Sequence, residues 1–227
     1  MTGTKDSKPC DQEICYDFSD KKEWMEMDGN EKRLSRPSLL LHSCCGPCST
    51  SVIERLAPDY EITVFFYNPN ITDEEEYEKR KETQLLFIEK YNEDPENPYT
   101  IGFKEGPYDR KNYYAVCEGL ESAPEGGRRC QECFRMRLKK TAEEASLLGY
   151  DTFATTLTVS PHKDYGAISS IGKRMAALYG IGFLDIDFKK KAGYQRSIIL
   201  SKKYGLYRQN YCGCEFANHG LKKEEEK

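Results

Sequence analysis

The sequence predicts an α/β protein built on a doubly wound, mostly parallel sheet. Short apolar runs that suit buried strands alternate with segments of helical periodicity along most of the chain. Proline, glycine and asparagine residues separate these segments, as expected for turns. Because strands that alternate with helices are joined by right-handed crossovers, the helices should cover both faces of the sheet.

The chain has 227 residues, of which 38% are hydrophobic and 32% are charged, which is enough for one core domain. We expect a polar N-terminal extension at residues 1–36, an α/β domain at residues 37–218 and a charged tail at residues 219–227. Cys10 and Cys15 lie in the extension, and we expect them to be incidental. No apolar run has the length of a membrane span or of a signal peptide. The sequence therefore predicts a cytoplasmic protein with no membrane partner.

The first predicted elements surround a cysteine-rich loop. Residues 38–42 are a continuous apolar run, typical of a buried strand, and lead directly into the string CCGPCS. A helix is expected over residues 49–56, because Pro58 ends the pattern that follows the loop. Residues 61–67 form a second apolar run and therefore a second predicted strand.

The middle of the chain is expected to contain a helix, a short strand and another helix. Thr72 and Glu75 have the spacing of a capping box, which predicts a helix that runs to about residue 91. Residues 99–103 are a candidate short strand in a stretch rich in proline and glycine, and residues 111–120 are a candidate helix.

The last third repeats the alternation of helices and strands. We expect one helical face over residues 134–148, a buried strand at 153–159, a helix at 163–179, a short strand at 183–186 and a final helix at 192–205. Gly149 suits the end of the first of these helices, and Asp164 suits the N-cap of the second.

Seven of the ten cysteines fall into three groups, and an eighth, Cys117, fits a small buried side chain. The groups are Cys44, Cys45 and Cys48 in HSCCGPCS, Cys130 and Cys133 in RRCQECFRMR, and Cys212 and Cys214 in NYCGCEF. Thiolates at these spacings can share a metal ion or a cluster, or can exchange a disulfide. Structural disulfides are rare in a reducing compartment, so these groups indicate metal or redox chemistry. That chemistry requires the groups to meet in space.

The first cysteine group lies at the carboxyl end of the first strand, where parallel sheets gather their ligands. It also precedes a helix, whose N-terminal N–H groups favour thiolate over thiol. Adjacent thiolates repel each other unless a cation such as iron or zinc shares their charge. The string from Cys45 to Cys48 also resembles the CGPC motif of thioredoxin, so a thioredoxin-like dithiol reductase is one alternative. A zinc-stabilised RNA-binding module is another.

The basic residues border the cysteine groups, although the net charge of the chain is -4. A basic surface around a reactive centre would attract a phosphate-bearing substrate, although a solvated helix face has the same composition. Candidates for contacts with RNA phosphates are Arg135, Arg137, Lys202, Lys203 and Arg208, and candidates for stacking on bases are Tyr207 and Tyr211. His42 and His162 are candidate proton donors, although a structural role is more common for a histidine at such positions.

A succession of motifs makes the sequence resemble the QueH-type epoxyqueuosine reductases. The motifs are LLLHSCCGPCS, the CxxC pair with its basic helix, TTLTVSPHKD and YGLYRQNYCGCEF, and together they span about residues 37–218. The resemblance implies reduction of epoxyqueuosine to queuosine at the wobble position of tRNA, the last step of queuosine biosynthesis. It also implies a sheet similar to the nucleotide-binding (HUP, ATP-pyrophosphatase-like) units. CCGPCS stands where such units carry a phosphate-binding SGGxDS, so we do not infer ATP use.

The resemblance further implies a [4Fe-4S] cluster beside a second thiol-bound centre, which is a mononuclear iron or a redox-active dithiol. Carried over by motif, the cluster ligands are Cys44, Cys45, Cys130 and Cys133, and the redox pair that closes to a disulfide is Cys212 and Cys214. A competing assignment divides the double cysteine, with one thiol on the cluster and the other on a separate iron with Cys48 and a CGC thiol. Relatives with aspartate in place of Cys48 would favour a metal ligand there. No flavin or nicotinamide fingerprint is visible, so we expect an external electron donor.

Overall fold

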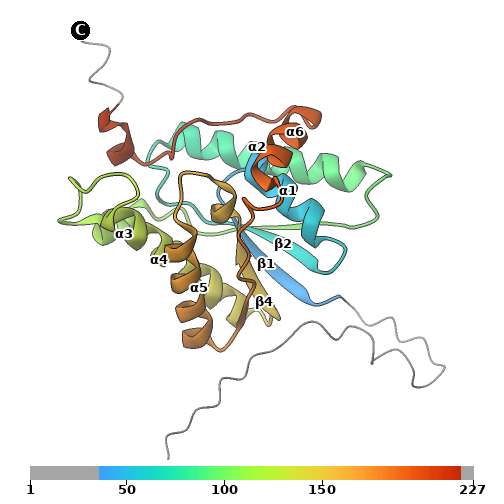
Figure 1. Ribbon diagram of the computed structural model, residues 1–227, viewed down its shortest axis with the longest axis horizontal. Coiled ribbons are helices and arrows are strands. Elements are labelled where there is room, and N and C mark those ends of the chain that lie inside the picture. Colours follow the sequence, from blue (N-terminus) through green and yellow to red (C-terminus); the bar gives the residue numbers. More distant parts are fainter. Residues whose placement is uncertain (1–35, 221–227) are drawn as a thin grey trace, which may run out of the picture. The chain divides into compact units, whose positions relative to one another are not determined.

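The computed structural model describes residues 36–220 of the chain (Figure 1). Most of the predicted extension, with Cys10 and Cys15, and most of the predicted tail lie outside the described residues. The described part contains a five-stranded sheet in the order β3-β2-β1-β4-β5. All neighbouring strands in it are parallel, which confirms the predicted α/β class.

The strands are β1 (Ser38–Ser43), β2 (Glu61–Phe66), β3 (Gly102–Glu105), β4 (Thr152–Thr155) and β5 (Gly182–Phe183). The α-helices are α1 (Gly46–Leu56), α2 (Glu74–Glu93), α3 (Arg110–Cys117), α4 (Arg128–Leu147), α5 (Tyr165–Tyr179) and α6 (Gly193–Lys203). Two short 3-10 helices, η1 (Thr156–Val159) and η2 (Glu215–Gly220), complete the described elements. None of the described helices combines the length and the apolar character needed to cross a membrane.

Helices cover both faces of the sheet (Figure 1). Leu39 and Leu41 of β1 pack against α1, α2 and α6, whereas Leu40 packs against α4 and α5. Successive side chains of a strand point to opposite faces, so a strand covered on both faces is apolar throughout. This explains why the run in β1 is continuous rather than alternating.

The strand order places a switch point beside β1. The chain leaves β1 through α1 toward β2 and β3, and later returns to the other side of β1 as β4. Ligands of open parallel sheets bind in the crevice outside the carboxyl ends of the strands at such a point. The first cysteine group and η1 both follow directly from these strand ends.

The predicted strand at residues 153–159 is wrong in its second half. β4 ends at Thr155, and the next four residues form η1, which the Thr155 hydroxyl caps by accepting a 3.1 Å hydrogen bond from the Leu157 N–H. Both segments are buried, so an apolar run alone could not distinguish them. The strand predicted at residues 183–186 is likewise shorter, and β5 covers only Gly182–Phe183.

The predicted capping box is also wrong. Asp73, not Thr72, caps α2, and its carboxylate accepts hydrogen bonds from the N–H groups of Glu75 and Glu76 at 3.0 and 3.4 Å. The Thr72 hydroxyl instead accepts from the N–H of Glu215 at 3.1 Å. It therefore ties the C-terminal segment to the start of α2.

Asp164 caps α5, as predicted, and a substitution there tests this cap. Its carboxylate accepts from the N–H groups of Gly166 and Ala167 at 2.8 and 3.4 Å. We expect Asp164→Ala to lower the free energy of unfolding by about 1 kcal/mol, because these donors lose their acceptor. Urea unfolding followed by circular dichroism measures the change. Asp164→Asn keeps an acceptor oxygen and should remain close to wild type, so an equal loss in both variants would contradict this explanation.

Candidate active site

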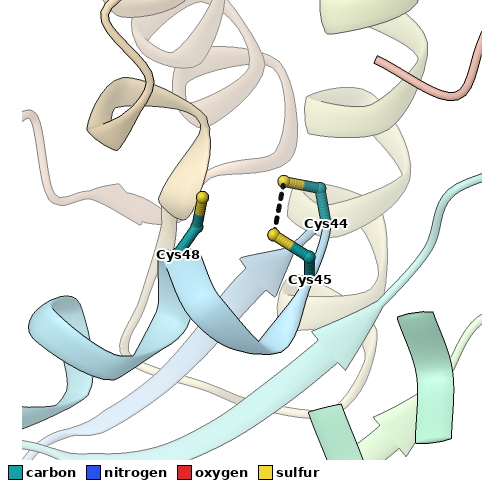
Figure 2. Close-up of side chains that lie close together, drawn as sticks. All are labelled: Cys44, Cys45 and Cys48. Atoms are coloured by element: carbon teal, nitrogen blue, oxygen red, sulfur yellow. Dashed lines mark hydrogen bonds between the residues drawn. The ribbon is translucent and has the colours of Figure 1, made fainter. Parts of the chain in front are cut away.

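Three cysteine sulfur atoms meet at the carboxyl end of β1 (Figure 2). The sulfur atoms of Cys44, Cys45 and Cys48 all lie within 4.8 Å of one another, and those of Cys44 and Cys45 are 3.9 Å apart. Such a separation allows one metal ion to bind all three. We call these residues the first sulfur group.

The local sequence explains why these thiols face one another. Cys45 is the N-cap of α1 in an extended conformation, and Pro47 occupies the first turn. The helix therefore begins at Gly46, three residues before the predicted start at residue 49, and Cys48 lies in its first turn. Because the thiols surround the start of a helix, its free N–H groups favour negative charge on them.

Polar contacts from α2 and β2 hold this loop. The hydroxyls of Ser43 and Ser49 donate to Oε1 of Gln84 at 2.8 and 3.1 Å, and all three residues are buried. The side-chain amide of Asn68 donates to the backbone carbonyl of Ser43 at 2.9 Å. The cysteine loop is therefore held by hydrogen bonds on both sides.

The thiols of the first sulfur group titrate unequally. Hydrogen bonds from the Cys45 and Cys48 thiols hold the pKa of Cys44 well below its usual value, and Lys163 and Arg137 add to this effect. The hydrogen bond to Cys44 in turn raises the pKa of Cys45 to about 11, and the bonds to both neighbours raise that of Cys48. Cys44 is therefore the thiol of this group that loses its proton first, and a bound metal would displace the remaining protons.

A second sulfur group contains Cys130, Cys133, Cys212 and Cys214. Cys133 and Cys214 are buried in one apolar cluster, against which Cys212 packs, and Cys130 is close enough for the charges of Cys212 and Cys214 to raise its pKa beyond the effect of burial. The structure thus unites the CxxC and CGC motifs, which lie far apart in the sequence. Cys117 belongs to the same buried cluster, and the Tyr113 hydroxyl lies 2.7 Å from the sulfur of Cys214.

A cavity of about 850 Å³ joins the two groups. Cys44 and Cys48 of the first sulfur group and Cys212 of the second line its wall. The charged and aromatic side chains in the wall are Arg80, Glu125, Arg137, His162, Lys163, Tyr194, Arg208 and Tyr211. The first and the third cysteine motif therefore meet at one basic cavity, whereas Cys130 and Cys133 do not line it. The division of the thiols among bound centres stays a prediction.

The predicted phosphate contacts occupy three different environments. Arg208 and Arg137 both line the cavity, but Arg137 is only 1% exposed and reaches it from the interior. Arg135 is exposed on α4, where it pairs with Glu132. Lys202 and Lys203 are exposed at the last turn of α6, and Lys203 pairs with Asp94 just past the end of α2.

Sequence reasoning missed the roles of Arg80 and Lys163. Arg80 lies in a predominantly acidic helix, so the charge pattern of the sequence did not single it out. Lys163 stands in the motif TTLTVSPHKD, directly before the cap of α5, which was a usable signal because that motif follows a strand end. Both side chains line the cavity.

His42 has a structural role, because both of its ring nitrogens have polar contacts in the interior. Its Nδ1 lies 2.9 Å from the Thr155 hydroxyl, and its Nε2 lies 3.3 Å from Nε of Arg137. Burial, followed by the positive charge of Arg137, lowers the pKa of His42 to about 3. The ring is therefore neutral near pH 7 and has no proton to donate as an imidazolium. His162, in contrast, is exposed and lines the cavity.

Arg80 anchors the CGC loop. Its guanidinium donates to the backbone carbonyls of Cys212 and Tyr211 at 3.0 and 3.3 Å, and pairs with Glu76 at 2.6 Å. Gly213, with a φ of +88°, passes so close that a Cβ atom would lie 3.1 Å from this guanidinium. Arg80 therefore positions the loop that brings Cys212 to the cavity.

We expect Arg80→Lys to loosen this loop while keeping a positive charge beside Glu76. Hydrogen bonds to charged groups contribute about 1.5–3 kcal/mol, so the loop should open about ten- to a hundredfold more often. Hydrogen exchange at the N–H groups of Thr72 and Glu215 reports this opening, because the first bonds to the Gly213 carbonyl and the second to the Thr72 hydroxyl. Arg196→Lys, at an exposed ion pair with Glu54, is the control. Unchanged exchange in Arg80→Lys would contradict the anchoring role.

The sequence is similar to those of known proteins over most of its length. The family described as "Epoxyqueuosine reductase QueH" matches residues 39–220. A protein of that name from Streptococcus pyogenes is 44% identical over 187 residues, which cover 82% of this chain and 72% of the relative. One from Staphylococcus aureus is 38% identical over 216 residues, which cover 93% of this chain and 87% of the relative. One from Thermotoga maritima is 36% identical over 183 residues, which cover 79% of this chain and 90% of the relative.

Proposed function

Since the chain belongs to the epoxyqueuosine reductase QueH family and is an oxidoreductase, we propose that it reduces epoxyqueuosine to queuosine at the wobble position of tRNA. This reaction is the last step of queuosine biosynthesis. The observation that carries the proposal is the first sulfur group in the wall of a basic cavity that Cys212 also lines. Because the family is one of oxidoreductases, the alternative of a non-enzymatic, zinc-stabilised RNA-binding module is wrong.

The proposed cofactor is a [4Fe-4S] cluster with a second thiol-bound iron beside it. Its proposed ligands are Cys44, Cys45, Cys130 and Cys133, with Cys48, Cys212 and Cys214 available to the second centre or to a dithiol. Two features support the fit. The donors are thiols, as such clusters require, and cations lie close enough to lower the pKa of Cys44. When bound, this centre supplies single electrons and a Lewis acid for the epoxide oxygen.

The reaction sets clear demands on the chain's own residues. Removing the epoxide oxygen breaks two C–O bonds, forms a C=C double bond and releases water, and consumes two electrons and two protons. The electrons come from an external donor. Lys163 lines the cavity and has no carboxylate within ion-pair distance among the described residues, so its ammonium group is free to hydrogen-bond the departing oxygen. His162 is the second candidate to supply a proton.

The proposed tRNA contacts begin at the cavity. Arg208 lines it, with its guanidinium 5.2 Å from the ring of Tyr194. Tyr211 is the nearest candidate for stacking on an unpaired base, and it also lines the cavity. Arg135, Lys202 and Lys203 are exposed and are proposed to contact phosphates farther along the RNA.

The test is conversion of a defined substrate. The protein, purified without oxygen and reconstituted with iron and sulfide, is incubated with dithionite and tRNA that carries epoxyqueuosine. We expect queuosine among the nucleosides released from the tRNA and detected by mass spectrometry. Absence of conversion by an iron-replete protein would reject the proposal.

A cysteine variant separates the proposal from thioredoxin-like chemistry. Cys130 lies outside the Cys45–Cys48 pair that resembles the thioredoxin motif. The proposed cluster chemistry predicts that Cys130→Ala is inactive and lacks the cluster. A reductase that used only the Cys45–Cys48 dithiol would remain active in this variant, and that result would favour the thioredoxin-like alternative.

A further inference from the structure

Arg137 of α4 is buried between the two sulfur groups. It is 1% exposed, and its guanidinium donates to Oδ1 of Asn68 at 2.6 Å and to Nε2 of His42 at 3.3 Å. A third nitrogen, Nη1, lies 4.0 Å from the sulfur of Cys133. The side chain is therefore fixed on three sides, and its charge has a defined position beside the second sulfur group.

No carboxylate neutralises this charge among residues 36–220. Arg137 forms no ion pair there, whereas Arg80, the other buried arginine of the cavity wall, pairs with Glu76 at 2.6 Å. Arg129 of α4 is buried too, but its guanidinium is occupied by backbone carbonyls of the loop before that helix. A buried cation is costly unless a negative charge is near, so the partner of Arg137 must be sought among the thiols.

Thiols of both groups lie beside this charge. Nη1 of Arg137 is 4.0 Å from the sulfur of Cys133 in the second sulfur group. Arg137 and Lys163 also line the cavity wall that contains Cys44 and Cys48 of the first sulfur group and Cys212 of the second. Thiols lose their protons when they bind a metal, so the bound centre brings the negative charge that the two cations lack.

We propose that Arg137, assisted by Lys163, is the counter-charge of the thiol-bound iron centre and holds its reduction potential high enough for an external donor to reduce it. The inference rests on the proposed function, because it assumes that the thiols bind iron. A fixed positive charge beside a cluster stabilises the reduced form, which is the more negative one. Arg137 acts on the centre through this charge, so it is a positioning residue.

The test compares charge with hydrogen bonding at one position. Arg137→Gln removes the charge but keeps an amide donor. Arg137→Lys keeps the charge but loses the planar set of N–H donors of the guanidinium. Arg135→Gln, two residues away on the exposed face of α4, is the matched control. The midpoint potential of the reconstituted protein is measured by anaerobic dye-mediated titration of its visible absorbance. We expect a more negative potential in Arg137→Gln, and values close to wild type in Arg137→Lys and Arg135→Gln.

Each other outcome has a defined meaning. An unchanged potential in an iron-replete Arg137→Gln protein overturns the inference, and so does an equal shift in Arg137→Lys, which would assign the effect to hydrogen bonding. If Arg137→Gln does not retain iron, Lys163→Gln is titrated instead, and an unchanged potential there overturns the inference. A wild-type protein that remains colourless after reconstitution would overturn the proposed cofactor and this inference together, so the two failures are distinguishable.

Discussion

Replacing Cys44 with alanine is expected to abolish both iron binding and epoxyqueuosine reduction. Cys44 lies within 4.8 Å of both other sulfur atoms of its group, and its thiolate is the one that the group forms first. Loss of a residue that only supports a metal ligand costs about 10–100-fold in affinity or activity, and loss of a ligand should cost more. Iron content per chain and the rate of queuosine formation measure the two effects. Full iron content in Cys44→Ala would show that this thiol is not a ligand.

A pair of substitutions at Cys48 serves as the control for this experiment. Aspartate at this position offers a carboxylate oxygen to a metal but cannot form a disulfide. We therefore expect Cys48→Asp to retain the second iron and part of the activity, while Cys48→Ala loses both. If the two variants are equally inactive and Cys48→Asp still binds iron, Cys48 acts as a redox thiol and not as a metal ligand.

Replacing Gly46 with alanine is expected to damage the site through packing alone. A Cβ atom there would lie 2.7 Å from the backbone carbonyl oxygen of Thr83 in α2. Because a helix backbone cannot yield locally, α1 must shift away from α2. Overpacking of this kind costs about 1–3 kcal/mol of stability. Since Cys45 and Cys48 flank Gly46, iron content should fall together with the free energy of unfolding measured in urea.

Gly166 provides the matched control for Gly46. It also lies in the first turn of a helix, but a Cβ atom there meets only the Asp164 carboxylate, at 3.3 Å. Gly166→Ala should therefore stay close to wild type in stability and in iron content. Wild-type stability in Gly46→Ala would mean that α1 and α2 can separate without cost, contrary to the packing described above.

Local sequence patterns were sufficient to predict which segments form strands and helices, but not to predict where each element ends. The continuous apolar run of β1 predicted a strand covered on both faces, and its packing confirms this. The run at residues 153–159, in which threonines separate apolar side chains, was interpreted as one buried strand, yet its second half is η1. Both halves are buried, so composition does not distinguish the two conformations, and the hydrogen bond from the Leu157 N–H to the Thr155 hydroxyl marks where the strand ends.

The candidate site was predictable to a similar extent. Adjacent and closely spaced cysteines can be recognised in the sequence, because one or two intervening residues keep their thiols close. The cations that neutralise them cannot be recognised in this way, because the residues that they contact lie far along the chain. Arg137 looked like a surface residue of a basic helix, yet 69 positions separate it from Asn68, which its guanidinium contacts.

The sequence by itself determined the alternation of strands and helices, the position of CCGPCS at a strand end and the resemblance to the QueH family. These properties depend on neighbours along the chain or on strings of residues. Only the tertiary structure decided that Cys133 of CxxC and Cys214 of CGC are buried in one hydrophobic cluster. It also decided that Arg80 holds the CGC loop and that Arg137 is buried. Such contacts arise when helices pack on a sheet, and packing depends on the shape of the whole core rather than on spacing in the chain.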